Sequence, residues 1–513
     1  MRIVNLAHPR SQTPPARRSE DPPQANYSAV RAYEAGRTAV VEPIAPQPTA
    51  EFAEALRVER PAAQPAPLPV PRPIATELGS RFFVWMHDPS VGSLGRRLAL
   101  VPTLVLNGPR NARIDTRLLG TTPVVRNADG DFLFPSETAE ADCAHVFALV
   151  QETLNLFQRA RDGAAIPWAW NMNGNADPIT IFPRAGTTAN AFYSRTQKAI
   201  KFFSHMPNGR TDVVFTCRSP ELVVHQTAHA MLDGLKPAWL GLYNPPQTGA
   251  LHEAFADVVA ILVMLSRADL ASALIAMTKA DLHAKRFLAA LAEHPGVALG
   301  RPSGLRNADN ELKLTEVTNE VHLISQVFTG AIYDIIADMF KFERLHQSRT
   351  KDPVHLLLEV TDHVSKVLLA SITRAPNIGA TYADVVNQML KVSREWNAPR
   401  IYRTFIYDQF AVRKVVAQDG PLAIARGEIE WENPEFTDRM DEAAELAPAL
   451  ADHPSLLTRQ DRADCCGTMQ LPEYAREPRK LDAELHRLCQ DGQTISEMEL
   501  LTEEIEALKK VFQ

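Results

Sequence analysis

The sequence predicts an α+β N-terminal lobe followed by an all-α C-terminal lobe. Segments with the β-branched and aromatic character of strands, such as RFFVWMH at 81–87 and KAIKFFS at 198–204, precede Ser219. Beyond Ser219, apolar residues recur at helical spacing. Strands followed by helices indicate the α+β class, and we expect a cleft between the two lobes. The helices expected in the second lobe cover 219–235, 250–267, 270–293, 318–342, 353–374 and 381–397.

The α+β lobe is assigned to residues 79–240. Beyond the two segments already quoted, LALVPTLVLN, ITIFP and NAFYS also have strand character. One long helix, AEADCAHVFALVQETLNLFQRA at 139–160, shows apolar residues at helical spacing between the strands. His145 within it is interpreted as a packing residue. The helical lobe is assigned to 241–400.

The first 78 residues form a proline-rich arm. Of the 38 prolines in the chain, 14 fall within the first 80 residues. PAAQPAPLPVPRP at 61–73 is typical of extended polyproline II, and we expect this arm to be disordered, without a packed core of its own. A tether is the leading interpretation, and a pro-segment or docking arm is the alternative.

Residues 401–513 are assigned to a C-terminal extension that ends in an amphipathic helix, SEMELLTEEIEALKK. Ser496 and Glu499 form a capping-box pattern at its start. One side of the helix is expected to carry Leu500, Leu501, Ile505 and Leu508. We expect it to pack on its own protein, with contact to a partner as the alternative.

Composition limits the classes of function. The chain has 513 residues, of which 45% are hydrophobic and 22% charged, with a net charge of −7. A mild acidic excess gives no reason to expect binding to nucleic acid or to an anionic membrane. The N-terminus has no apolar core of a secretory signal, and AFADVVAILVML is too short to span a bilayer and contains Asp257. Five irregularly spaced cysteines make no disulfide framework, which favours a cytoplasmic location.

Two histidines four residues apart suggest a metal site. LVVHQTAHAMLDGL places His225 and His229 on one face of the expected helix 219–235. Zinc takes nitrogen and oxygen ligands at about 2 Å, and a catalytic zinc site leaves one position open. An isolated pair of histidines at this spacing is common by chance, so a third ligand has to come from elsewhere.

The next helix offers that ligand. LHEAFADVVAIL places Glu253 and, one turn later, Asp257 on an otherwise apolar helix. Buried carboxylates need a positive partner. We expect Glu253 to be the third ligand and Asp257 to bond the distal nitrogen of a ligand histidine, as metal-bound histidines normally require.

These motifs resemble those of the thermolysin-like zinc metallopeptidases, the gluzincins, in which H-E-x-x-H is followed by a helix bearing E-x-x-x-D. The resemblance covers about residues 137–400 and implies a two-lobed fold, one zinc ion and a peptide substrate bound in extended form in the cleft. Further matches lie in TANAFYSRTQKAIKFF, GLYNPPQTGALHEA, PSGLRN and NEVHLISQVFTGAIYDI.

The resemblance assigns roles to individual residues. Asn190, Ala191 and Tyr193 stand in the edge strand whose backbone pairs with the substrate. Tyr243 and His322 stand where the family contacts the oxyanion. The loop residue Arg306 matches the arginine that binds a substrate carbonyl, and an ordinary surface arginine is the alternative. Apart from the resemblance, Asp233 follows His229 by one helical turn and is expected to bond nearby backbone or a ligand histidine, with a surface role as the alternative.

One departure from the family concerns calcium. Met264 stands where secreted relatives carry an acidic ligand of paired calcium ions, and Glu221 keeps one acidic position. A lone carboxylate makes no calcium cage, so a paired calcium site is not expected.

Cys465 and Cys466 suggest comparison with thiolates that block zinc, but buried, inert cysteines are the better interpretation.

The second departure is Gln226, which replaces the glutamate that accepts a proton from the attacking water. An amide is the same size and can hydrogen-bond water, but it cannot accept the proton. Losing a general base costs about 10²–10⁴-fold in rate, which is about 3–5 kcal/mol of barrier. We therefore expect a zinc metallopeptidase that is inactive or strongly impaired, whether the glutamine is natural or engineered. The alternatives are a zinc-binding pseudoprotease that holds peptides as a binding or scaffold module, and a structural protein without metal.

Overall fold

The structure, a computed structural model, describes residues 79–90, 95–207, 211–241, 244–283, 310–317, 320–347, 350–416 and 495–513. All of them belong to one compact unit of the chain, Ala45–Gln513. The proline-rich arm and most of the C-terminal extension lie outside the described residues. So do Tyr243, Arg306, Cys465, Cys466, Cys489 and residues 284–293 of the expected helix 270–293.

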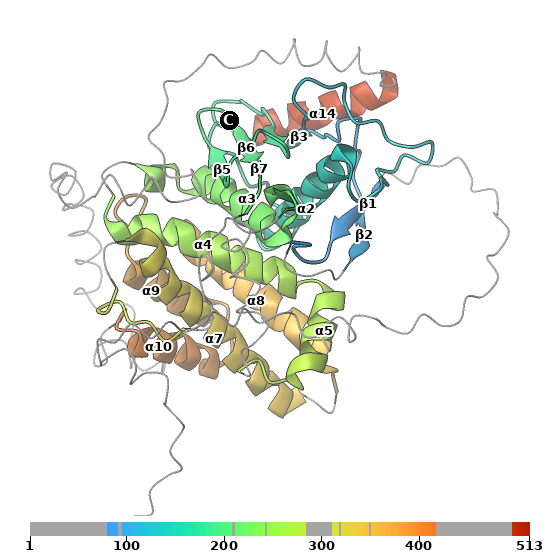
Figure 1. Cartoon of the computed structure of the whole chain (residues 1–513). Helices are drawn as coiled ribbons and strands as arrows, with labels where there is room; N and C mark the ends of the chain where they lie inside the picture. Colours follow the sequence, from blue (N-terminus) through green and yellow to red (C-terminus); the bar gives the residue numbers. More distant parts are fainter. Residues whose placement is uncertain are drawn as a thin grey trace, which may run out of the picture. The chain divides into compact units, whose positions relative to one another are not determined.

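In the part of the chain that the structure describes, the N-terminal region contains three small sheets around the long helix α2 (Figure 1). β1 (Ser80–Trp85) pairs with β2 (Arg96–Val101) in antiparallel register. The largest sheet has the order β3-β4-β6-β5, with parallel pairs between its first three strands and β5 antiparallel at the edge. The elements that complete this part are β3 (Ile114–Thr116), α2 (Ala139–Arg159), β4 (Ile179–Phe182), β5 (Ala191–Ser194), β6 (Ala199–Phe202), β7 (Ser204–His205) and β8 (Val214–Phe215).

The strand expected over 98–107 is shorter than predicted. β2 ends at Val101, directly before Pro102. Proline has no backbone N–H for the sheet ladder, so the run of apolar residues continues past it without strand pairing along its length.

Two helices carry the predicted metal ligands. α3 (Pro220–Leu235) begins with proline at its first position, and the Ser219 hydroxyl accepts a hydrogen bond from Leu222 N–H as the N-cap. α4 (Pro246–Leu265) starts four residues before the predicted boundary, because Pro246 also fits the first turn of a helix. A short 3₁₀ helix, Pro237–Leu240, lies in the connection between them.

The C-terminal part is helical, as predicted. It contains α5 (Ala268–Thr278), α7 (Val321–Gln347), α8 (Pro353–Arg374), α9 (Tyr382–Glu395) and α10 (Arg400–Val412). α5 ends at Thr278, before the predicted end at 293, because Lys279 after it has a left-handed backbone with φ of 52° that closes the helix. α10 was not predicted. It packs on α7 and α9, so helical packing continues past the boundary placed at residue 400.

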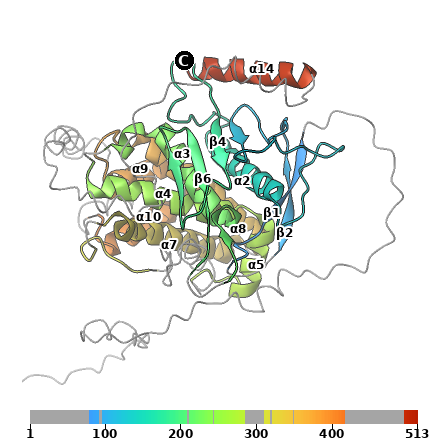
Figure 2. The same cartoon turned by 45° about the horizontal axis from the view of Figure 1, so that its top comes forward.

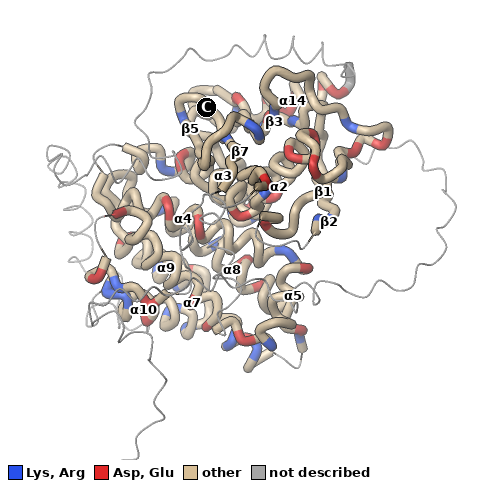
Figure 3. Tube along the Cα trace, viewed as in Figure 1, with Lys and Arg blue, Asp and Glu red and all other residues tan. Residues whose placement is uncertain are grey.

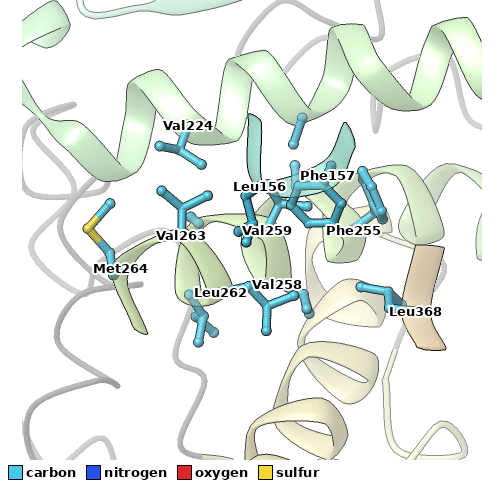
Figure 4. Packing of buried hydrophobic residues seen from close by; sticks show 14 of the residues in the cluster. Leu156, Phe157, Val224, Phe255, Val258, Val259, Leu262, Val263, Met264 and Leu368 are labelled. Carbon is cyan, nitrogen blue, oxygen red and sulfur yellow. The ribbon is translucent and has the colours of Figure 1, made fainter. Parts of the chain in front are cut away.

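α4 lies at the centre of this arrangement. It packs on α3 on one side and on α7 and α8 on the other (Figures 1 and 2). Figure 4 shows Phe255, Val259 and Val263 of α4 among apolar side chains from neighbouring helices, including Val224 of α3 and Leu368 of α8. α4 and α7 are long and apolar enough to cross a membrane by length and composition, but each is largely buried inside the fold.

The C-terminal helix α14 (Ile495–Val511) packs on the N-terminal part. Leu501, Ile505 and Phe512 form a small apolar cluster with Leu106, Ala112 and Ala176. The backbone N–H of Gly174 donates to the carbonyl of Phe512 at 3.2 Å. Leu500 was expected on the packed side, but its side chain is 46% exposed because neighbouring helix positions point about 100° apart.

Candidate metal centre

His225, His229 and Glu253 come together in the fold as the sequence predicted. Their ligand atoms lie within 4.8 Å of one another, and all three side chains are buried. The Nε2 atoms of the two histidines are 3.0 Å apart, and they lie 3.7 and 3.6 Å from the two carboxylate oxygens of Glu253. Among the residues that the structure describes, this is the one group of three or more such side chains that could hold a metal ion.

The donor separations fit a single ion. Ligands at about 2 Å in tetrahedral directions lie about 3.3 Å apart, which falls within the observed range. The 89° angle between the two imidazole planes lets both Nε2 atoms approach a common point from different sides. A fully buried Glu253 also favours a cation there, because a carboxylate removed from water needs positive charge nearby.

The distal nitrogen of each histidine has a partner on α4. His225 Nδ1 lies 3.0 Å from Asp257 Oδ1, as predicted. His229 Nδ1 lies 2.8 Å from His252 Nδ1, a contact that was not predicted. Burial lowers the pKa of His252 to about 3, so its imidazole is neutral near pH 7.

The site combines buried residues of α3 and α4, and α4 contributes few charged groups. Glu253 and Asp257 are the only charged residues of α4, whose tube in Figure 3 is otherwise tan. Gln226, between the two ligand histidines in α3, is also fully buried. In such surroundings the local dielectric is low and electrostatic interactions are strong.

His322 lies in the first turn of α7, the helix packed against α4. Its Nδ1 bonds Glu320, whose other carboxylate oxygen accepts from Leu323 N–H at 2.8 Å. Burial opposes ionisation of Glu320, but the bond to His322 outweighs it and lowers the pKa of Glu320 to about 2. His322 Nε2 is buried and has no hydrogen-bond partner among the described residues.

The predicted substrate strand lies at the edge of its sheet. Among the described residues β5 pairs with β6 on one side only, and Asn190 directly precedes β5. The side-chain oxygen of Asn190 accepts from Ala191 N–H at 2.8 Å. The backbone carbonyl of Asn190 accepts from the Thr216 hydroxyl at 3.2 Å. Ala191 is fully buried, so any contact of Ala191 with a peptide would come from its backbone.

Tyr193 and Asp233 bond each other. The Tyr193 hydroxyl donates to Asp233 Oδ2 at 2.7 Å, and Arg195 Nε donates to the same oxygen at 2.7 Å. The expectation that Asp233 bonds a ligand histidine or nearby backbone is therefore wrong. Asp233 lies one helical turn beyond His229, and the Asp233 carboxylate faces β5 and the turn that follows this strand.

The positions compared with the calcium ligands have other contacts. Glu221 lies 3.1 Å from His87 Nδ1 and accepts from the Ser219 hydroxyl at 3.1 Å. The Met264 sulfur accepts from Arg267, a residue that also bonds Glu152. A guanidinium thus lies next to Met264, the position compared with a calcium ligand of the family that the sequence resembles.

Two residues that contact histidines of the site, His252 and Glu320, were not predicted from the sequence. Their positions in the sequence gave only a weak indication, because His252 directly precedes Glu253 and Glu320 lies two residues before His322. Comparison with known proteins adds nothing to these assignments, because no protein-family model and no curated protein matches this sequence.

Proposed function

We propose that this chain is a thermolysin-like zinc metallopeptidase whose peptide hydrolysis is strongly impaired or lost because Gln226 replaces the general base. The observation that carries the proposal is the convergence of two imidazoles and one carboxylate at separations of 3.0–3.7 Å, with a partner on each distal nitrogen. Two histidines and a glutamate form a known set of catalytic zinc ligands.

Zn²⁺ held by His225, His229 and Glu253 would polarise a peptide carbonyl and lower the pKa of the attacking water. The remaining steps depend on the chain's own side chains. The Gln226 amide can orient a water molecule but cannot take its proton. His322 Nε2 would donate to the developing oxyanion, and Glu320 would hold the ring in that orientation.

Substrate binding is proposed to use the free edge of β5. An extended peptide would form main-chain hydrogen bonds beyond Asn190 and Ala191, which requires no change in the sheet. We place the peptide in a cleft between the α+β part and the helical part, and the whole protein in the cytoplasm. Tyr243 and Arg306 are proposed to complete the site.

A zinc-binding pseudoprotease is the second candidate. It is favoured by the same glutamine, since the chain keeps its metal-ligating group and its edge strand while the proton acceptor is absent. Such a protein would hold extended peptides without cutting them.

Measurement of bound zinc and of casein or peptide cleavage tests these proposals on the full chain and on Gln226→Glu. We expect about one zinc in both proteins, with cleavage rising about 10²–10⁴-fold in the glutamate form. Gln388→Glu makes the same chemical change in α9, outside the metal group, and should leave cleavage at the level of the parent.

The outcomes separate the candidates. Zinc in both proteins with no cleavage in either supports the pseudoprotease. Absence of zinc from both contradicts the metal site and both candidates with it.

A further inference from the structure

Three imidazoles and one carboxylate form a continuous chain of contacts across α3 and α4. Asp257 contacts His225 Nδ1 at 3.0 Å, His225 Nε2 faces His229 Nε2 at 3.0 Å, and His229 Nδ1 faces His252 Nδ1 at 2.8 Å. His252 Nε2 ends the chain and is buried without a hydrogen-bond partner among the described residues. Each contact between two ring nitrogens needs one proton, so the tautomers are coupled.

Without an ion, the Asp257 carboxylate determines which ring nitrogen of each histidine carries the proton. Asp257 accepts from His225 Nδ1–H, which leaves a lone pair on His225 Nε2. A proton must then lie on His229 Nε2 to avoid two opposed lone pairs at 3.0 Å. His229 Nδ1 becomes an acceptor, and His252 donates to it from Nδ1–H.

With an ion bound, His229 and His252 each need the opposite tautomer. A metal bound through His229 Nε2 needs the lone pair on that atom, so His229 carries its proton on Nδ1. His252 Nδ1 must then accept, and its own proton moves to Nε2. His225 keeps the same tautomer in both states.

We propose that His252 is a positioning residue that fixes the tautomer of His229 and reverses its own tautomer when the metal binds. The inference rests on the proposed metal site. The proton count is unchanged, because the His252 Nδ1 proton passes to His229 Nδ1 and the proton lost from His229 Nε2 is replaced, through solvent, at His252 Nε2. The bound state therefore contains a buried N–H without an acceptor among the described residues, which limits metal affinity.

Nitrogen-15 NMR of histidine-labelled full-length protein tests the reversal directly. We expect His252 to carry its proton on Nδ1 without zinc and on Nε2 with zinc. His145 provides an internal reference. Its Nδ1 accepts from Trp85 N–H at 3.1 Å, and burial keeps its pKa well below the usual value, so it should stay in the Nε2–H form throughout.

Zinc affinity, measured by competition with a chelator, gives a second readout. His252→Leu removes the acceptor for His229 Nδ1–H and should weaken zinc binding about 10–100-fold. His252→Asn places an amide oxygen near the former Nδ1 position, so binding should equal or exceed that of the parent. His145→Asn, the same change at a buried imidazole outside the metal group, should leave affinity unchanged.

Different results would contradict the role of His252 and the metal site itself. If the parent binds zinc and His252 has one tautomer in both states, the inference is wrong and the proposed function stands. An unaltered zinc affinity in folded His252→Leu contradicts it in the same way. If the parent binds no zinc, the NMR reversal is absent and both proposals fail.

Discussion

Glu320 shows how one carboxylate can connect site geometry with stability. Its bond to His322 holds its pKa at about 2, below the ordinary value of 4.5. An acid with a lowered pKa in the folded state stabilises the fold above its ordinary pKa, and that contribution is lost as the pH falls toward the lowered value. The contribution of Glu320 should therefore be complete above pH 4.5 and disappear toward pH 2.

Denaturant unfolding of the parent and of Glu320→Gln measures this contribution. We expect the parent to be more stable by about 1–2 kcal/mol near pH 6, after allowance for partial solvent screening. The difference should shrink as the pH falls from 4.5 toward 2. A difference that stays constant over this range would show that the carboxylate charge is not involved.

The sequence predicted the three side chains of the candidate metal centre but not all their neighbours. His225, His229 and Glu253 are predictable because helical spacing determines which side chains share a face. His252 was missed because a histidine beside a ligand can equally be a packing residue until the helix rotation is known. Asp233 was assigned to the wrong partner for a similar reason, since Tyr193 and Arg195 approach it from a strand and turn distant in sequence.

At the scale of elements, Asp233 joins the end of α3 to the edge strand. Its carboxylate is fully buried and receives hydrogen bonds from Tyr193 and Arg195. Asp233→Asn removes the charge from both bonds and should lower the free energy of unfolding by about 2 kcal/mol. Tyr193→Phe removes one bond only and should cost about 1 kcal/mol.

Calorimetry or urea unfolding of the two variants provides the measurement. Leu98→Ala is a suitable control, because Leu98 belongs to β2 and is 52% exposed. Equal effects from all three substitutions would mean that the buried carboxylate contributes nothing specific.

Element boundaries depended on proline more than on the apolar pattern. Pro102 shortened the predicted strand, and Pro246 extended the predicted helix in the N-terminal direction. α10 was missed because its sequence, RIYRTFIYDQFAV, mixes aromatic and charged residues without a clear start signal. Its burial against α7 and α9 supplies the stability that local preference does not indicate.

At the scale of the molecule, α14 connects the end of the chain to its N-terminal part. Leu501 is 3% exposed in the contact, whereas Leu500 next to it is 46% exposed. Leu501→Ala should cost about 2–5 kcal/mol if the helix unfolds together with the rest of the protein. Leu500→Ala, the matched control, should change stability by less than about 0.5 kcal/mol.

Thermal unfolding together with limited proteolysis checks both variants. We expect Leu501→Ala to make α14 sensitive to protease, because fewer apolar contacts hold it against Ala112 and Ala176. Identical digestion of the two leucine variants would contradict the packing of α14 described above.

The ligands of the candidate metal centre come from two helices that are joined by residues 236–245 and packed against different neighbours. α3 contacts the β5 strand, whereas α4 contacts α7 and α8. A bound ion would cross-link these helices independently of the peptide chain between them. Because α3 and α4 also pack directly on each other, a single backbone cut in that connection would leave the two fragments associated, and bound metal would make their dissociation harder still.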